Sequence, residues 1–319
     1  MSSKPKISVI TASKNGGRFL RETIESIRQQ RFTDYEHVVA DGASTDNTID
    51  ILKEYPHIKW KSEPDQHPEE GFAKALAMAR GEYVMICCVS DGYLDRDWFK
   101  KCVEVLDNDP EVSLVYGIPQ CILEDGTFVR NISSDFMEQS PPQKTDFFAF
   151  WLGSFAVCTE ITFCVRADVF RRCFPQYEPS GYFLKSHSIL SFSYNFNTQG
   201  YLPYFLPVIA SYGRYHHDSA SAGLVKDNRI AKKQYQSAIM QYADEVLSGR
   251  REHAFRDGKS EVIKVIELHE LKRCRQRVLN CRINRKAYLG KKHPRGHRYY
   301  LRKFRILLLY CLCGHRIFN

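Results

Sequence analysis

The sequence lacks the long apolar segments that would place the chain within or across a membrane. No run approaches the roughly 20 apolar residues of a spanning helix, and the longest candidate, ILLLYCLC at 306–313, is too short. The amino-terminal stretch MSSKPKISVI has no extended apolar segment of the kind found in a secretion signal. These absences predict a cytoplasmic protein. Peripheral attachment to the inner face of the membrane is the alternative, which the basic end of the chain suggests.

The 11 cysteines form no CxxC pair and have no zinc-like spacing. Several, among them Cys87, Cys88 and Cys164, lie inside apolar runs, which indicates buried free thiols in a reducing compartment. Internal repeats and low-complexity segments are missing as well. With 43% hydrophobic and 13% aromatic residues, the composition indicates a globular protein with a sizeable core.

Acidic residues are missing from the end of the chain, where residues 271–319 carry 15 basic residues and no acidic one. Residues 1–225 hold 22 Lys and Arg against 29 Asp and Glu, whereas residues 226–319 hold 24 against 8. Residues 223–319 are therefore predicted to form a basic helical tail. Its apolar content over 260–319 suits an anionic membrane surface, and a helical bundle or homodimer contact is the alternative. No recognition motif accompanies the charge, so no nucleic-acid partner is expected.

The first part of the chain alternates between strand and helix patterns. Apolar, β-branched runs occur at 7–12, 35–40, 58–63, 82–89 and 112–117. Helical patterns between them predict an α/β fold with a mostly parallel sheet and helices on both faces. Four carboxylates come just after these strands: Asp41, Glu63, Asp65 and Asp91. Because ligands bind at the carboxyl ends of such strands, these side chains should face one crevice.

The pattern changes after residue 118. A hairpin is predicted around Asp125-Gly126, a strand at 161–166 followed by a short helix, and extended chain at 204–215. Residues 144–153 suggest an aromatic helix or a loop over the crevice, and residues 182–198 are ambiguous.

Five segments occur in a familiar order: ISVITASKNGGRFLRETIESIRQQ, HVVADGASTDNTIDIL, WKSEPDQ, ARGEYV and SDGYLDRDWF. Together they resemble family 2 of the glycosyltransferases, which are inverting enzymes with the GT-A fold. The resemblance covers residues 6 to about 221. It implies a GT-A domain at 1–222, with a nucleotide-sugar half at 1–117 and an acceptor half at 118–222.

The resemblance also implies a donor site. Thr11, Ser13 and Asp41 would line the base and ribose, and a carboxylate can accept from the uracil imide or from ribose hydroxyls, so a UDP-linked sugar is expected. Glu63 and Asp65, in the Ser-Glu-x-Asp segment, would lie beside the donor.

Lys74 and Ser90 complete the expected donor contacts. Lys74 would pair with the diphosphate, with a solvated helix lysine as the alternative. Many relatives carry Tyr-Asp-Ala before this lysine, whereas the matching residues here are 69–71, Glu-Glu-Gly.

Relatives end the fourth strand with Asp-x-Asp or Asp-Asp, whose carboxylates hold Mn²⁺ or Mg²⁺ against the donor diphosphate. The matching residues here are 88–91, Cys-Val-Ser-Asp, so only Asp91 remains. A turn or capping role is its alternative. The segment RYHHDSAS at 214–221 resembles an Arg-x-His-x-x-Ser-x-Ser motif, which would bring His216 to the diphosphate or the metal.

The general base is the second departure from the family pattern. Relatives supply it from an acidic segment, but no acidic residue lies between Glu178 and Asp218. His187 has a suitable pKa and is the first candidate, and Glu178 is the second. Two functions follow: an inverting glycosyltransferase acting on a glycan or lipid-linked saccharide, or an impaired relative that binds a sugar nucleotide or serves as a scaffold. A nucleotidyltransferase is disfavoured because no glycine-rich basic loop follows the first strand.

Overall fold

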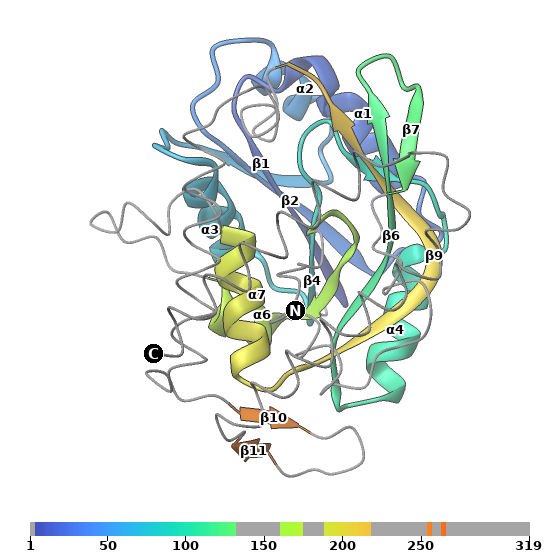
Figure 1. The fold of residues 1–319 in the computed structure, drawn as a ribbon. Coiled ribbons are helices and arrows are strands. Elements are labelled where there is room, and N and C mark those ends of the chain that lie inside the picture. The colour runs from blue at the N-terminus through green and yellow to red at the C-terminus, as the bar shows by residue number, and fades with distance from the viewer. Residues whose placement is uncertain (1–3, 132–159, 175–187, 218–253, 257–262, 266–319) are drawn as a thin grey trace, which may run out of the picture.

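A computed structural model describes residues 4–131, 160–174, 188–217, 254–256 and 263–265 (Figure 1). The expectations for residues 144–153, for Glu178 and His187, and for most of the tail lie outside these residues. Within the tail, only two short strands are described, β10 (Ala254–Arg256) and β11 (Ile263–Val265), which pair with each other. At those six residues the helical prediction for the tail is wrong.

The amino-terminal part alternates between strands and helices as predicted. Its strands are β1 (Ile7–Ser13), β2 (Tyr35–Asp41), β3 (Ile58–Ser62) and β4 (Tyr83–Ile86), and its helices are α1 (Gly17–Arg28), α2 (Thr48–Lys53) and α3 (Pro68–Met78). The four strands pair in parallel, in the order β3-β2-β1-β4.

The second part extends the same sheet with strands of mixed direction. Its elements are β5 (Gly92–Tyr93), α4 (Trp98–Asn108), β6 (Val112–Leu123), β7 (Phe128–Asn131), the 3₁₀ helix η1 (Glu160–Thr162), β8 (Cys164–Arg166), α6 (Ala167–Cys173), α7 (Ser188–Thr198) and β9 (Leu202–Tyr215). The sheet order is β3-β2-β1-β4-β8-β6-β9-β5, with β7 beside β6. Strand β6 runs without a break through residue 117, so the two predicted halves share a strand.

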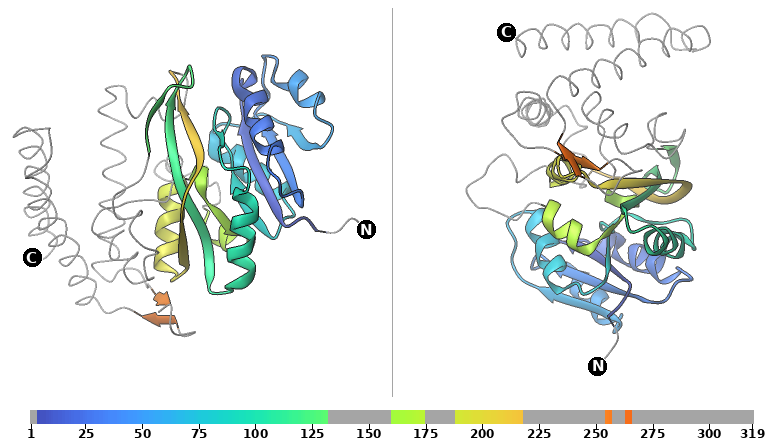
Figure 2. Two further views of the ribbon diagram at one scale, coloured as in Figure 1. Left: turned by 90° about the vertical axis from the view of Figure 1, so that its right-hand side faces the viewer. Right: turned by 90° about the horizontal axis from the view of Figure 1, so that it is seen from below.

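Helices cover both faces of the sheet. Successive residues of a strand point to opposite faces, so a continuous apolar strand needs packing partners on both. In β2, Val38 and Ala40 pack in the cluster that includes α3, α6 and α7, whereas Val39 packs against α1 and α2. Figure 2 shows the long strands β6 and β9 between α7 and α4. Strands β1, β2 and β4 are therefore largely buried on both faces, which explains their continuous apolar runs, whereas the edge strand β3 is mostly exposed.

Several predicted boundaries shift by a few residues. Strand β4 ends at Ile86 instead of continuing to residue 89, because the chain turns before Asp91. Helix α3 begins at Pro68, where a missing N–H costs nothing, and α4 begins at Trp98. The hairpin around residues 125–126 is confirmed by the pairing of β6 with β7.

The register of the parallel strands aligns their carboxyl ends. Ser13 pairs with Asp41, and Asp41 pairs with Ser62. Three strand ends therefore share one edge of the sheet, as the sequence predicts. The site is built on this edge.

A buried hydrogen-bond chain crosses β2, β1 and β4 below that edge. The Thr11 hydroxyl donates to the Cys87 carbonyl at 2.7 Å and lies 3.0 Å from Nε2 of His37. Since the single hydroxyl proton is used for Cys87, Nε2 of His37 must carry a proton and donate to Thr11. Burial lowers the pKa of His37 to about 3, and the ring is therefore neutral.

This histidine should make the stability of the protein depend on pH. An unfolded chain takes up the proton near pH 6.5, whereas the folded protein resists it to about 3, so stability is lost as the pH falls through that window. Between about pH 7 and 4.5, the free energy of unfolding should fall by about 2.5 kcal/mol through this group alone. Urea unfolding of the wild type and of His37→Gln, which keeps a donor for Thr11, measures the difference. Identical pH dependence in the two proteins would contradict this assignment.

Candidate functional site

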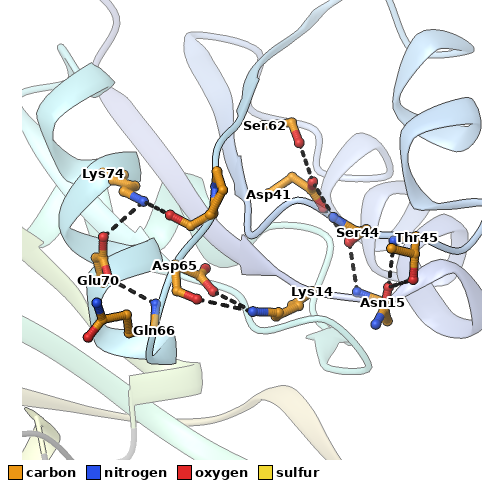
Figure 3. Close-up of polar contacts among 11 residues, drawn as sticks. Lys14, Asn15, Asp41, Ser44, Thr45, Ser62, Asp65, Gln66, Glu70 and Lys74 are labelled. Atoms are coloured by element: carbon orange, nitrogen blue, oxygen red, sulfur yellow. Dashed lines mark hydrogen bonds and ion pairs between the residues drawn. The ribbon is translucent and has the colours of Figure 1, made fainter.

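Asp41 lies at the end of β2 and is 2% exposed. Its carboxylate accepts from the backbone N–H of Ser44 at 3.0 Å, from the Ser44 hydroxyl at 2.5 Å and from the Ser62 hydroxyl at 2.6 Å (Figure 3). The carboxylate is therefore held in one orientation at the edge of the sheet. It links the ends of β2 and β3 with the loop that leads to α2.

The loops after β1 and β2 interlock. Asn15 donates its N–H to the Ser44 hydroxyl at 2.7 Å, and its side-chain oxygen accepts from the Thr45 N–H at 2.8 Å. Asn15 and Ala43 both adopt positive φ, at 52° and 56°, which is costly for residues with a Cβ. The backbone is thus fixed in a specific shape where the sequence predicts the base and ribose.

Asp65 lies in the same region, after β3. Its carboxylate is 3.3 Å from Nζ of Lys14, which also donates to the Asp65 carbonyl at 3.1 Å (Figure 3). A Cβ on Gly42 would lie 2.5 Å from this carboxylate, and one on Gly71 would lie 2.9 Å from the Cβ of Ala12. Both positions therefore need glycine for close packing around Asp65. Lys14, which the sequence did not single out, is its partner.

Glu63 and Lys74 have local partners. Lys74 donates to the Pro64 carbonyl at 2.6 Å and pairs with Glu70 at 3.0 Å, so it ties the loop after β3 to α3 (Figure 3). Glu63 pairs with Lys61 at 2.6 Å and is partly exposed. A role for Lys74 at a diphosphate would require it to leave these two oxygens, and it stays a prediction.

The two predicted residues of β1 differ in their surroundings. Thr11 is fully buried in the hydrogen-bond chain to His37 and Cys87, which places its side chain below the aligned strand ends. Ser13 stands at the edge beside Asp41 and is 3% exposed. Among the described residues, no hydrogen-bond partner is found for its hydroxyl. Ser13 is therefore the better placed of the two to receive a ligand.

Asp91 lies in a tight turn between β4 and β5. The preceding Ser90 has φ 84°, a left-handed conformation rare for residues other than glycine. Gly92 follows because a Cβ there would lie 2.6 Å from the hydroxyl of Tyr212 and 2.8 Å from that of Ser26. The Asp-Gly pair is thus fixed by packing against β9 and α1.

Asp91 is 9% exposed, and its carboxyl accepts the backbone N–H of Arg214 at 3.2 Å. Burial raises the pKa of Asp91 to about 8, and the negative charge of Glu160 adds to the rise. Burial raises the pKa of Glu160 as well. Cys88, three residues before Asp91, is half-buried, and desolvation raises the pKa of its thiol well above its ordinary value, so it stays protonated.

His216 reaches the same turn from the end of β9. Its Nε2 lies 3.2 Å from the Ser90 hydroxyl, and its ring lies 4.9 Å from that of Phe19. The structure thus brings His216 next to the Ser90–Asp91 turn, although 124 residues separate them in the chain.

The structure gathers most of the predicted residues in two adjoining groups. One surrounds Asp41, with Ser13 and Asp65, and the other surrounds Asp91, with Ser90 and His216. Sequence analysis missed Glu160 and Arg214, both of which act on Asp91. Glu160 is an isolated acidic residue that belongs to no recognisable motif. Arg214 belongs to the segment RYHHDSAS, in which His216 is the expected functional residue.

Comparison with known proteins gives these groups a context. The model of the family Glycosyl transferase family 2 matches residues 8–174. An uncharacterized glycosyltransferase of Mycobacterium tuberculosis is 33% identical over 120 residues, which span 37% of this chain and 46% of the relative. Chondroitin synthase of Escherichia coli is 26% identical over 131 residues, or 40% of this chain and 19% of that protein. The matched part is thus less than half the length of these relatives.

Solved structures agree with the family match. TarS (1-349) of S. aureus superposes with a TM-score of 0.61 at 16% identity, over 91% of this chain and 75% of that one. A mannosyltransferase of Pyrobaculum calidifontis, in complex with GDP-Man and Mn²⁺, superposes with a TM-score of 0.52 at 17% identity, over 97% and 82% of the two chains. The chain has the GT-A fold that the sequence predicts, and it belongs to glycosyl transferase family 2.

The buried Asp91 carboxyl should lower the stability of the protein when no cation is bound. Its folded pKa of about 8 lies above the ordinary 3.8, so the folded form holds the proton more tightly and stability falls as the pH rises between these values. At about pH 8, Asp91→Asn should therefore raise the free energy of unfolding by at least about 2 kcal/mol.

Urea unfolding with a chelator present checks this gain. The control is Asp50→Asn, an exposed carboxylate on α2 that should change stability by less than about 0.5 kcal/mol. A less stable Asp91→Asn protein would show that the carboxyl is well compensated in the fold.

Proposed function

We propose that the protein is an inverting glycosyltransferase that moves a sugar from a nucleotide-diphospho sugar, UDP-linked in our assignment, to a glycan or lipid-linked saccharide. The observation that carries the proposal is the buried Asp91 carboxyl beside a rigid set of strand-end loops. Such a carboxyl costs stability unless a ligand compensates it, and costs of this kind are typical of functional sites.

The donor would lie along the aligned ends of β1, β2 and β3. Asp41, fixed by two serines, offers acceptors to a base imide or a ribose, and the Ser13 hydroxyl lies next to it. Structures of TarS with UDP and with UDP-GlcNAc, and of the mannosyltransferase with GDP-Man, concern proteins of the same fold. They support a nucleotide sugar as the ligand class.

The residues around Asp91 suit Mn²⁺ or Mg²⁺. Two carboxyl groups, of Asp91 and Glu160, act on each other there, and His216 lies at the same turn. Within the described residues, no three His, Cys, Asp or Glu side chains are arranged to enclose a metal ion. In our proposal, Asp91 and its neighbours supply only part of the ligands of the cation, and water and the donor phosphates supply the rest. A bound cation would neutralise charge on the leaving diphosphate.

The acceptor side rests on residues outside the described part of the chain. A base must take the proton of the acceptor hydroxyl as the nucleotide leaves, and His187 is our candidate, with Glu178 as the second. Asp91 and His216 would orient the diphosphate, and the fixed loops would orient the nucleotide.

The alternative is a sugar-nucleotide-binding or scaffold protein without turnover. The specific observation in its favour is the segment 88–91, Cys-Val-Ser-Asp, in which Asp91 is the one carboxylate left where the resemblance implies a pair. This loss would weaken cation binding. Only turnover separates the two functions.

The basic segment 260–319 would bring the site to an anionic membrane where lipid-linked acceptors lie, and would place the protein at the inner face of the cytoplasmic membrane. The alternative is that this segment forms a contact between two copies of the chain. None of the helices in the described ranges is long and apolar enough to cross a membrane.

The first experiment is nucleotide release from a panel of UDP-, GDP- and TDP-sugars with Mn²⁺. We expect slow, metal-dependent hydrolysis of one donor, reduced on the order of 100-fold in Asp91→Asn and unchanged in the exposed control Asp50→Asn. Binding by calorimetry without any turnover would favour the scaffold. Absence of both binding and turnover would overturn the proposal.

Glu160 provides a second test of the cation site. Removing its like charge in Glu160→Gln should lower the pKa of Asp91, because repulsion is one cause of the rise. If Glu160 also faces the cation, Mn²⁺ affinity measured by electron paramagnetic resonance at about pH 9 should fall roughly tenfold. Glu104→Gln, an exposed change on α4, serves as the control. Tighter Mn²⁺ binding in Glu160→Gln would exclude Glu160 from the site.

A further inference from the structure

The Ser90–Asp91 turn needs outside support because of its backbone conformation. Ser90 holds φ at 84°, and residues with a Cβ adopt this region only where the surroundings impose it. We propose that Arg214, together with Thr23, is a positioning residue that imposes this conformation and thereby aims the Asp91 carboxyl and the Ser90 hydroxyl at the donor. The inference rests on the proposed function, since it concerns the same site.

Helix α1 supports the turn through one hydroxyl. The Thr23 side chain is fully buried, and its oxygen accepts the Ser90 N–H at 3.1 Å. The same hydroxyl donates to the Asp91 carbonyl at 2.8 Å. The peptide groups on both sides of Ser90 and Asp91 are thus fixed to one side chain.

Strand β9 supports the turn from the other side through Arg214. Its backbone N–H binds the Asp91 carboxyl at 3.2 Å, and its Nε donates to the Ser90 carbonyl at 3.4 Å. The backbone and the side chain of one residue therefore hold both residues of the turn.

The guanidinium of Arg214 is itself held by three elements. Nη1 donates to the Glu124 carbonyl at 2.9 Å, and Nη2 pairs with Glu22 of α1. The ring of Phe19 lies 5.0 Å from the guanidinium carbon, and that of Tyr212 lies 5.6 Å away. The arginine therefore connects β9, α1 and the β6–β7 turn to the peptide of Ser90.

These contacts argue against a direct role at the diphosphate. The Arg214 side chain is 5% exposed, and its three nitrogens all donate to protein oxygens. In our proposal, Arg214 therefore affects donor binding indirectly, by holding the Ser90–Asp91 turn in its conformation. Since His216 follows two residues later and reaches the Ser90 hydroxyl, the same anchor also places the histidine.

The test uses glycine to separate strain from other effects. Glycine adopts positive φ at no steric cost, whereas alanine removes the Ser90 hydroxyl but keeps the Cβ. We therefore compare Arg214→Met in three backgrounds: wild type, Ser90→Gly and Ser90→Ala. The binding readout is the Kd of the nucleotide found in the donor panel, measured by calorimetry with Mn²⁺.

We expect Arg214→Met to weaken binding at least tenfold in the wild-type and Ser90→Ala backgrounds, and less than threefold in the Ser90→Gly background. A merely structural role would give the same loss in all three. Equal losses would overturn the proposal, whereas a wild-type protein that binds no nucleotide would count against the proposed function.

A second readout needs no ligand. With Arg214 present, Ser90→Gly should be more resistant to urea than Ser90→Ala, and this difference should shrink once Arg214→Met lets the turn relax. If Arg214→Met does not fold, Thr23→Val replaces it. This change removes the hydroxyl that supports the turn from α1 and leaves the charge of Arg214 in place, and it should give the same pattern. A difference between the two Ser90 variants that does not change with either support would overturn the inference.

Discussion

The burial of the Asp91 carboxyl governs the arrangement around it. A carboxyl in low dielectric is stable only when protonated, hydrogen-bonded or paired with a cation. Here it lies in the turn between β4 and β5, with a second carboxyl, Glu160, acting on it and one backbone N–H bound to it. The close packing at Gly92, the left-handed Ser90 and the inward-facing Arg214 all follow from keeping the group in this place.

The group of residues around Asp41 obeys a different constraint. Parallel strands in register bring their carboxyl ends to one edge of the sheet. Side chains that are distant in the sequence therefore meet there because of the topology alone. Asp41 is held there by short hydrogen bonds and close loop packing, not by opposite charge. The polar region around Asp41, where we propose the nucleotide, thus lies next to the buried carboxyl of Asp91, where we propose the diphosphate.

Much of this could be predicted from the sequence because the first half is locally determined. Apolar runs and the patterns between them specify β1 to β4 and the helices that join them, and the shared edge follows from the parallel topology alone. The position of Glu160 could not be predicted, because it depends on how η1 packs after a segment with no periodic pattern. The clamp by Arg214 was equally hidden, since its partners Glu22, Ser90 and Glu124 are spread over three elements and share no motif.

The long strand β9 has a consequence for how the protein folds. Its last residues complete a site whose other parts, apart from Glu160, lie in the first 91 residues, so contacts of very high sequence separation must form before the turn is fixed. Such contacts carry a large loop-closure entropy and slow the final step of folding. On the ribosome, the amino-terminal sheet can assemble early, yet the Asp91 turn gains its second support only after residue 214 has emerged.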